Sequence, residues 1–321
     1  MPPQRSDLRL LDRKLLFVTG KGGVGKTSVA SALGHLAASR GQRTLVCEVD
    51  SKGDLAEFFG VPTLGFEPTE VRRNLYAMAM DTEESLKEYL RLQLKIPMLA
   101  KVGPLARTFD FIANAAPGVK EILTVGKLTW EVRERHYDLV VVDASATGHV
   151  VGQLASPVAI NDLVKVGLVR NQTDWMIEIL TDPAQTAVVV VTAPEEMPVS
   201  ETLELVGRLG EETDIEVASV VVNRVLPELF ARSDEEIFDR LRELDAMEQL
   251  ARQVGPGIGS VMAGAELAVS LRRSRVQHLT RLREGLPSGM DVLNLPYLFT
   301  RSHGVRATAK IADALGEELG F

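Results

Sequence analysis

The stretch Thr19-Gly20-Lys21-Gly22-Gly23-Val24-Gly25-Lys26-Thr27-Ser28 determines the fold of this 321-residue chain. An apolar run, Leu15-Leu16-Phe17-Val18, precedes it and predicts a buried strand. Residues 29–36 follow it and predict a helix, because Val29, Leu33 and Leu36 recur at helical spacing. Strand, glycine-rich loop and helix in this order are the context in which a G-x-x-x-x-G-K-[ST] match indicates a phosphate-binding loop.

Each part of this loop has an expected role in holding a nucleoside triphosphate. Glycines let backbone N–H groups converge on the phosphates, and the helix directs its positive end at the same anion. Lys26 is expected to reach the terminal phosphates, and the Thr27 hydroxyl to hold Mg²⁺. The alternative, a glycine-rich turn with a chance lysine, is disfavoured by both flanking elements. The predicted nucleotide-binding residues of the loop are Gly20, Lys21, Gly22, Gly23, Val24, Gly25, Lys26, Thr27 and Ser28.

Two aspartates follow predicted strands of the same sheet. Asp50 comes after the apolar run 44–49, and Asp143 ends the run 137–142. Ligands of open α/β sheets bind at the carboxyl ends of the strands. We expect Asp50 to orient the water that attacks the γ-phosphate, the alternative being a helix-capping aspartate. We expect Asp143 to face Mg²⁺, through a water molecule, as a strand-end carboxylate does in phosphate-loop ATPases.

Lys21 is a second lysine, near the front of the loop. It is either a solvated loop lysine or a charge offered to a nucleotide that another subunit holds. The sequence G-K-G-G-V-G-K-T resembles the deviant phosphate loop (deviant Walker A motif) of a class of dimeric ATPases, which includes the nitrogenase iron protein. This resemblance implies that Lys21 crosses a dimer interface and acts in catalysis together with Asp50 and Lys26.

Composition excludes several other classes of protein. A net charge of −8 argues against a sequence-independent grip on nucleic acid, which needs a basic surface. No apolar stretch approaches the roughly 20 residues of a membrane span, so direct membrane insertion is not expected. Residues 1–13 lack the apolar core of a signal peptide, and the expected location is cytoplasmic. The single cysteine, Cys47, cannot form an intrachain disulfide or a multi-thiolate metal site.

The remaining pattern predicts one α/β phosphate-loop ATPase domain over residues 1–321, with a mostly parallel central sheet flanked by helices. Helical insertions are expected at about 81–136, covering the nucleotide face, and at 150–182. Residues 1–11 are expected to be a loose arm. Further strands are predicted at 75–80, 186–192, 217–222 and 292–296. The segment 50–60 is predicted to be a loop that runs into a short helix, and further helices are predicted at 198–209, around 237–244 and 267–271, and at the C-terminus.

Two late strand ends supply further nucleotide-binding candidates. Asn223 follows the strand 217–222, and its carboxamide suits the N6/N7 edge of adenine. An asparagine that supports the following turn is an equal alternative. Pro296, at the end of the last predicted strand, is also predicted to be a nucleotide-binding residue. The basic residues at 272–283 predict a solvated or ion-paired helix face, or a partner surface.

Together these motifs resemble the arsenical-pump and tail-anchored-protein-targeting ATPase family over nearly the whole chain. The resemblance rests on the phosphate loop, on the switch segments 50–60 and 143–149, and on Pro117-Gly118, Glu121, Pro194-Glu195, Glu201 and Asn223. It implies ATP and Mg²⁺ as cofactors. The departures are Ser51-Lys52-Gly53 for the usual Pro-Ala-His, an altered second switch, and the absence of the CxxC zinc pair and of the metalloid cysteines.

The leading prediction is a Mg²⁺-dependent ATPase, converting ATP and water to ADP and phosphate, that works as a nucleotide-switched dimer. The partner would be a second copy or a paralogous ATPase. The alternatives are a factor that captures hydrophobic or membrane-protein clients and the energising subunit of an anion exporter. A small-molecule kinase also stays open, because phosphate-loop folds host many chemistries. A membrane-positioning ATPase is disfavoured by the acidic tail 316–321.

Overall fold

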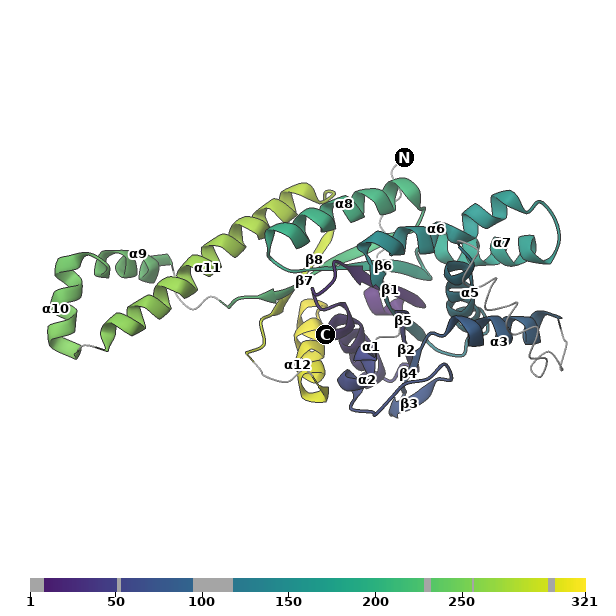
Figure 1. Ribbon diagram of the computed structural model, residues 1–321, viewed down its shortest axis with the longest axis horizontal. Helices are drawn as coiled ribbons and strands as arrows, with labels where there is room; N and C mark the ends of the chain where they lie inside the picture. The colour runs from purple at the N-terminus through teal and green to yellow at the C-terminus, as the bar shows by residue number, and fades with distance from the viewer. Residues whose placement is uncertain (1–8, 51–52, 95–117, 228–231, 256, 300–303) are drawn as a thin grey trace.

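The computed structural model describes residues 9–50, 53–94, 118–227, 232–255, 257–299 and 304–321. Their centre is an eight-stranded sheet in which all neighbouring strands are parallel except the β3–β4 edge pair. This confirms the predicted α/β class with a mostly parallel sheet (Figure 1). In spatial order the strands are β3 (Thr69–Arg72), β4 (Leu75–Ala79), β2 (Thr44–Glu48), β5 (Leu139–Ala146), β1 (Leu15–Gly20), β6 (Thr186–Thr192), β7 (Val217–Val225) and β8 (Asp291–Pro296).

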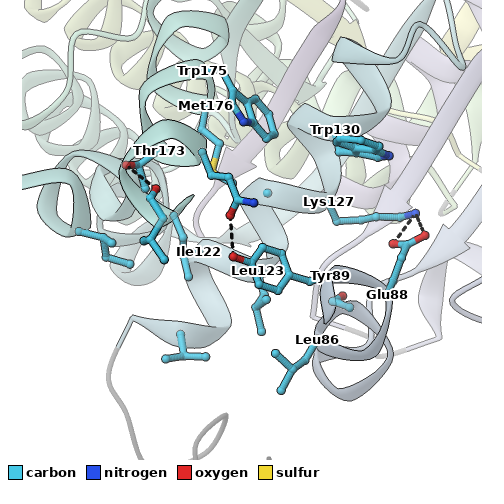
Figure 2. A pocket seen from close by; sticks show the side chains of 16 residues that line it. Leu86, Glu88, Tyr89, Ile122, Leu123, Lys127, Trp130, Thr173, Trp175 and Met176 are labelled. Atoms are coloured by element: carbon cyan, nitrogen blue, oxygen red, sulfur yellow. Dashed lines mark hydrogen bonds and ion pairs between the residues drawn. The ribbon is translucent and has the colours of Figure 1, made fainter. Parts of the chain in front are cut away.

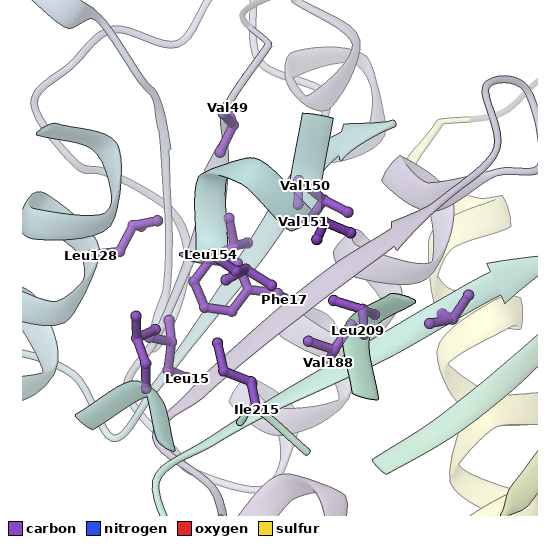
Figure 3. Packing of buried hydrophobic residues seen from close by; sticks show 14 of the residues in the cluster. Leu15, Phe17, Val49, Leu128, Val150, Val151, Leu154, Val188, Leu209 and Ile215 are labelled. Carbon is purple, nitrogen blue, oxygen red and sulfur yellow. The ribbon is translucent and has the colours of Figure 1, made fainter. Parts of the chain in front are cut away.

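Helices cover both faces of the sheet, because strand side chains alternate between two apolar clusters. From β1, Leu15 and Phe17 enter one cluster, while Leu16 and Val18 enter the other. The first cluster (Figure 3) packs under α5 (Val119–Arg133), α6 (Thr147–Leu163), α7 (Leu168–Thr181), α8 (Glu196–Glu212) and the end of α11 (Ile258–Gly285). The second packs under α1 (Lys26–Ser39), α2 (Asp54–Phe59) and α12 (Val305–Glu318).

The central strands are buried along their whole length, which is why they read as unbroken apolar runs. Their register brings the site residues to one edge. Val18 pairs with Asp143 in β5, and Gly20 lies opposite Val191 in β6. Gly20 has φ +147°, and a Cβ there would come 2.1 Å from the Val191 carbonyl oxygen. Only glycine therefore lets β1 run directly into the phosphate loop at this separation.

Three helices form an arm that extends from the sheet. Figure 1 shows α9 (Arg232–Leu241), α10 (Leu244–Val254) and the first half of α11 lying beyond β7 and β8. Two α11 arginines attach the arm to the end of β7: Arg272 donates to the Leu226 carbonyl at 3.1 Å, and Arg275 donates to the Arg224 carbonyl at 3.2 Å. Arg273 pairs with Asp239 of α9 at 3.1 Å. The predicted basic helix face is thus engaged within the chain at these residues.

One expectation about the periphery was wrong, and one edge strand was not predicted. Leu10 and Leu11, expected to belong to a loose arm, form part of a 3₁₀ helix (η1, Leu10–Asp12) and are buried against the second cluster. The edge strand β3 was not predicted, because most of its side chains are exposed and lack an apolar pattern. The part of the first helical insertion at residues 95–117, including Pro117, lies outside the described residues. The described part contributes α3 (Thr82–Leu94) and α5.

The second insertion, predicted at 150–182, corresponds in position to α6 and α7. Among the described residues, no helix combines the length and the apolar character that a bilayer crossing needs.

Candidate functional site

The phosphate loop connects β1 to α1, and its conformation depends on glycine. Gly23 has φ +85° and Gly25 has φ +96°, both in the left-handed region that favours glycine. Gly25 is the N-cap of α1, so Lys26 and Thr27 begin the helix. The loop borders a pocket of about 280 Å³. Of the predicted loop residues, the pocket is lined by Gly22, Gly23, Gly25, Lys26, Thr27 and Ser28.

Asp143 and Thr27 meet at the base of this pocket. The Thr27 hydroxyl donates to Asp143 Oδ2 at 2.6 Å, and only 7% of the Asp143 side chain is exposed. Asp143 Oδ1 is buried and has no hydrogen-bond partner among the described residues. Burial raises the pKa of Asp143 to about 6, and the Thr27 hydrogen bond and the Lys26 charge oppose that rise. Asp143 is thus a buried carboxylate with one oxygen able to accept a hydrogen bond from a ligand or to face a cation.

Asp50 stands beside this pair, where the two switch segments meet. Ser145 Oγ, from β5, donates to Asp50 Oδ1 at 3.0 Å. Thr19 Oγ1 in turn donates to the Ser145 carbonyl at 2.9 Å, which joins the switch to the start of the phosphate loop. Asp50 is exposed and lines the pocket. A carboxylate that lines the pocket and is oriented by a neighbouring hydroxyl has the properties that a water-positioning group needs.

Glu48 belongs to the site but was not among the predicted residues. It is 3% exposed and ends β2, and its carboxylate accepts from the Gly53 N–H at 3.3 Å and the Asp54 N–H at 3.1 Å. Burial raises the pKa of Glu48, while these backbone hydrogen bonds lower it. Glu48 therefore anchors the start of α2, which belongs to the first switch segment. The sequence signal for it was an acidic residue inside an otherwise apolar strand.

Lys21 does not line the pocket. Its Nζ forms an ion pair with Glu201 of α8 in the same chain. The second Glu201 oxygen accepts from the Thr147 hydroxyl, at the start of α6, at 3.4 Å. Both the Lys21 and Glu201 side chains are partly exposed, at 29%. Lys21 thus lies on the outer side of the loop, joined to the second switch, and its action on another subunit's nucleotide stays a prediction.

The two late candidates lie differently. Asn223 is buried, its Nδ2 donates to the Val24 carbonyl at 2.9 Å, and its Oδ1 accepts from the Arg224 N–H at 2.9 Å. The carboxamide holds the phosphate loop and the turn after β7, and its reading of adenine stays a prediction. Pro296 is exposed at the end of β8, and neither residue lines the pocket. Arg224, which sequence reasoning passed over, does line it.

Comparison with known proteins identifies relatives over most of the chain. The model of the anion-transporting ATPase family matches residues 13–173 and 165–250. The ATPase BagA of Mycobacterium tuberculosis is 31% identical over 306 residues, covering 90% of this chain and 87% of that protein. A putative arsenical pump-driving ATPase of Halobacterium salinarum is 30% identical over 75% of this chain and 40% of its own length. An ATPase ASNA1 homolog of Entamoeba dispar is 25% identical over 67% of this chain and 77% of its own.

Proposed function

This chain belongs to the anion-transporting ATPase family, and on that premise we propose that it binds ATP with Mg²⁺ and hydrolyses the ATP to ADP and phosphate. The observation that carries the proposal is the pairing of Thr27 with Asp143 beneath the glycine loop. A phosphate loop whose helix begins with Lys26 and Thr27, facing a strand-end carboxylate, is the arrangement that phosphate-loop ATPases use for nucleotide and metal.

The donor set at this point fits Mg²⁺. Magnesium prefers oxygen ligands and usually keeps several waters, binding through one or two protein oxygens and the phosphates. The Thr27 hydroxyl and the partnerless Asp143 Oδ1 supply such oxygens, and the raised pKa of Asp143 reflects a buried charge that a cation would stabilise. When bound, Mg²⁺ would neutralise charge on the phosphate oxygens.

The chain's own groups divide the remaining work. Backbone N–H groups of the loop and the Lys26 ammonium hold the terminal phosphates against the start of α1. Asp50, oriented by Ser145 Oγ at 3.0 Å, positions the attacking water in line with the γ-phosphate. Ser145, in the second switch segment, contacts Asp50 of the first, and its carbonyl accepts from Thr19 at the start of the phosphate loop. We therefore expect loss of the γ-phosphate to change the conformation of both switch segments.

We further propose that the active form is a dimer, with a second copy or a paralogous ATPase as partner. The resemblance of the loop to the deviant class supports this, as does the position of Lys21 on the outer side of the loop. In the isolated chain the Lys21 ammonium is ion-paired with Glu201. Dimer closure on ATP would transfer that ammonium to the partner's nucleotide and leave Glu201 with the Thr147 hydroxyl as its remaining contact. Nucleotide state would then set the position of α6, which begins at Thr147.

The experiment that tests the proposal compares Lys26→Ala with Lys14→Ala, an exposed lysine just before β1. Lys26→Ala should weaken ATP binding about 100-fold, because hydrogen bonds to a charged group are lost, and should remove turnover. Lys14→Ala should behave as wild type. Free phosphate as product, rather than a phosphorylated metabolite, distinguishes an ATPase from a kinase. Wild-type ATP affinity and turnover in Lys26→Ala would overturn the proposal.

One observation favours a client-binding role as the second candidate. The arm exposes apolar side chains that the described residues leave uncovered, including Val254, Val261 and Leu267, each at least 61% exposed. A client-binding surface would use exposed apolar side chains such as these, provided that they form a contiguous patch. A client that is released on ATP hydrolysis would place the chain in this class.

An energising role in anion export, the third candidate, has less support. Cys47 is fully buried in β2, and burial raises the pKa of its thiol, so it is a poor soft-metal ligand as it stands. Activation by arsenite or antimonite that Cys47→Ser abolishes would reverse this ranking.

A further inference from the structure

A second pocket lies among helices of the chain, away from the nucleotide. It is a cavity of about 230 Å³ bounded by α3, α5, α6 and α7, and it shares no lining residue with the phosphate-loop pocket. An engineered cavity of about 150 Å³ with apolar walls binds benzene, so this one has room for a somewhat larger molecule. This volume is below the roughly 300–1,000 Å³ of most ligand pockets, which fits a compact ligand rather than an extended one.

The walls of the cavity are almost entirely apolar. Figure 2 shows Trp130, Trp175 and Met176 in the upper half of the view and Leu86 and Leu123 in the lower half. The two indole rings meet edge to face, with centroids 6.5 Å apart and planes at 60°. These are the only tryptophans of the whole chain. Rigid aromatic and branched walls favour a rigid apolar body over a flexible polar one.

Gln172 of α7 gives this cavity a buried polar group that is only partly satisfied. The side chain is 5% exposed, and its Oε1 accepts from the Tyr89 hydroxyl at 2.6 Å. Its Nε2, also buried, has no hydrogen-bond partner in the part of the chain that the structure describes. A buried donor without an acceptor costs about 1–3 kcal/mol, so such groups usually have a partner in the functional state. The Gln172 amide is therefore a donor available to a ligand that carries an acceptor.

The charges at the cavity wall indicate what the ligand is not. Lys127 lines the cavity but is paired with Glu88 at 2.8 Å and Glu131 at 2.7 Å, and all three side chains are largely buried. Figure 2 shows the Lys127–Glu88 contact at the edge of the cavity. One ammonium against two carboxylates leaves no excess positive charge, even though His136 Nδ1 also contacts Glu131 at 2.7 Å. A carboxylate or phosphate ligand would gain no cation here and would lose its hydration.

We propose that this cavity binds a neutral small organic molecule with a compact apolar body and one carbonyl-type acceptor. The apolar body contacts Trp130, Trp175 and Met176, and the acceptor receives the Gln172 Nε2–H hydrogen bond. Gln172 stays fixed by Tyr89 while it donates, because the two bonds use different ends of its carboxamide. This site is additional to the nucleotide site and does not depend on hydrolysis.

The test uses the intrinsic fluorescence of the full chain, because both tryptophans line the cavity. The probes are 2-adamantanone, a rigid cage with one carbonyl, and 1-adamantanecarboxylate, the same cage with a charge. We expect a saturable, one-site change in tryptophan emission with the ketone and at least about tenfold weaker binding of the carboxylate. Gln172→Met keeps the length of the side chain without the donor and should weaken ketone binding about tenfold.

Ile122→Phe, which adds a ring to the cavity wall, should abolish ketone binding. Ile237→Phe, on an exposed site of α9, is the matched control and should leave it unchanged. Near-ultraviolet circular dichroism confirms that each variant is folded. No saturable change with folded wild type, equal binding of the carboxylate, or unchanged affinity in Gln172→Met would each overturn the proposal. So would binding of an apolar transmembrane peptide that Ile122→Phe blocks while the ketone does not bind. Since the two pockets share no lining residue, these results leave the ATPase proposal untouched.

Discussion

The nucleotide pocket and the helical cavity are built in opposite ways. Loops and residues at the ends of β1, β2 and β5 form most of the first, so strand register and glycine conformation largely fix its shape. Side chains from α3, α5, α6 and α7 form the second, so packing fixes its shape. A site for a multiply charged phosphate chain needs backbone dipoles held rigidly in place. A site for an apolar molecule needs only the right volume and few polar groups.

The two pockets also treat buried carboxylates differently. Glu131, near the cavity, accepts from Lys127 at 2.7 Å and is ion-paired within the chain. Asp143, in the nucleotide pocket, is held by the Thr27 hydroxyl and keeps one oxygen without a partner among the described residues. A charge that the fold itself compensates is structural, while one left uncompensated indicates where a ligand supplies the balance. The predictions below test this contrast, from the largest expected effect to the smallest.

The largest effect tests whether the nucleotide pocket is incomplete within one chain. A cation delivered in trans is worth about 10³–10⁵ in rate, so Lys21→Ala should lower kcat by that factor with a smaller change in ATP affinity. If the partner is a second copy, mixing Lys21→Ala with Asp50→Asn chains should restore turnover. One site of the mixed dimer then has its own Asp50 and the neighbour's Lys21.

Dilution below the dimerisation constant should remove this rescue, and Lys21→Ala chains alone provide the baseline. Absence of rescue where mixed dimers demonstrably form would mean that Lys21 acts within its own chain. The nucleotide pocket would then be complete within one chain.

The second effect concerns the compensated charge near the cavity. Lys127→Met removes the ammonium shared by the buried carboxylates of Glu88 and Glu131, which should lower the free energy of unfolding by about 3–5 kcal/mol in urea titrations at pH 7. Lys87→Met is the matched control, because Lys87 also pairs with two glutamates, Glu83 and Glu84, but is 46% exposed. Its loss should be below about 1 kcal/mol. Equal losses would show that burial does not distinguish the two clusters.

The third effect concerns the uncompensated charge. Burial raises the pKa of Asp143 from 3.8 to about 6, so the nucleotide-free protein loses stability as the pH rises from about 4 through 6. Asp143→Asn, neutral at every pH, should therefore stabilise it by about 3 kcal/mol at pH 7.5 and by less at pH 5. Denaturant titrations at both pH values measure this, with the exposed Asp162→Asn as control. A pH-independent difference would contradict the assignment.

The smallest effect separates the two aspartates of the nucleotide pocket. Asp50→Asn should keep ATP affinity and lower kcat about 100-fold, the lower end for loss of a group that handles the attacking water. Asp54→Asn, whose side chain lines the same pocket, is the control and should turn over normally. The reverse result in single-turnover assays would assign water positioning to Asp54.

The nucleotide pocket could be predicted because its parts are contiguous in sequence or follow strands. The loop is one motif, and β2 and β5 are buried apolar runs whose ends carry Asp50 and Asp143. The contacts that could not be predicted join residues distant in sequence. The Asn223 bond to the Val24 carbonyl joins residues 199 positions apart, and the Lys21–Glu201 pair joins residues 180 apart. The sequence around either residue of such a pair does not indicate which distant residue it will contact.

The cavity could not be predicted for a related reason. Apolar residues at helical spacing on α3, α5 and α7 predict a packed core equally well, and a void depends on how the helices meet. Gln172 reads as an ordinary polar position on a helix until its burial is known. At the edge of the sheet, β3 was missed because Thr69, Glu70 and Arg72 are exposed, so pairing with β4 leaves no apolar pattern.

The attachment of the arm has a mechanical consequence. Arg272 and Arg275 fasten α11 to the carbonyls just after Asn223, the residue whose amide holds the phosphate loop. The helix therefore has a fulcrum a few bonds from the nucleotide pocket. From Ile258 to Arg272 it extends about 21 Å at 1.5 Å per residue. A tilt of about 10° at the fulcrum would sweep the far end through roughly 4 Å on that length. A small displacement at the phosphate loop would thus become a larger one at α9 and α10. A distance measurement between spin labels, one of them placed on α9 or α10, would detect it.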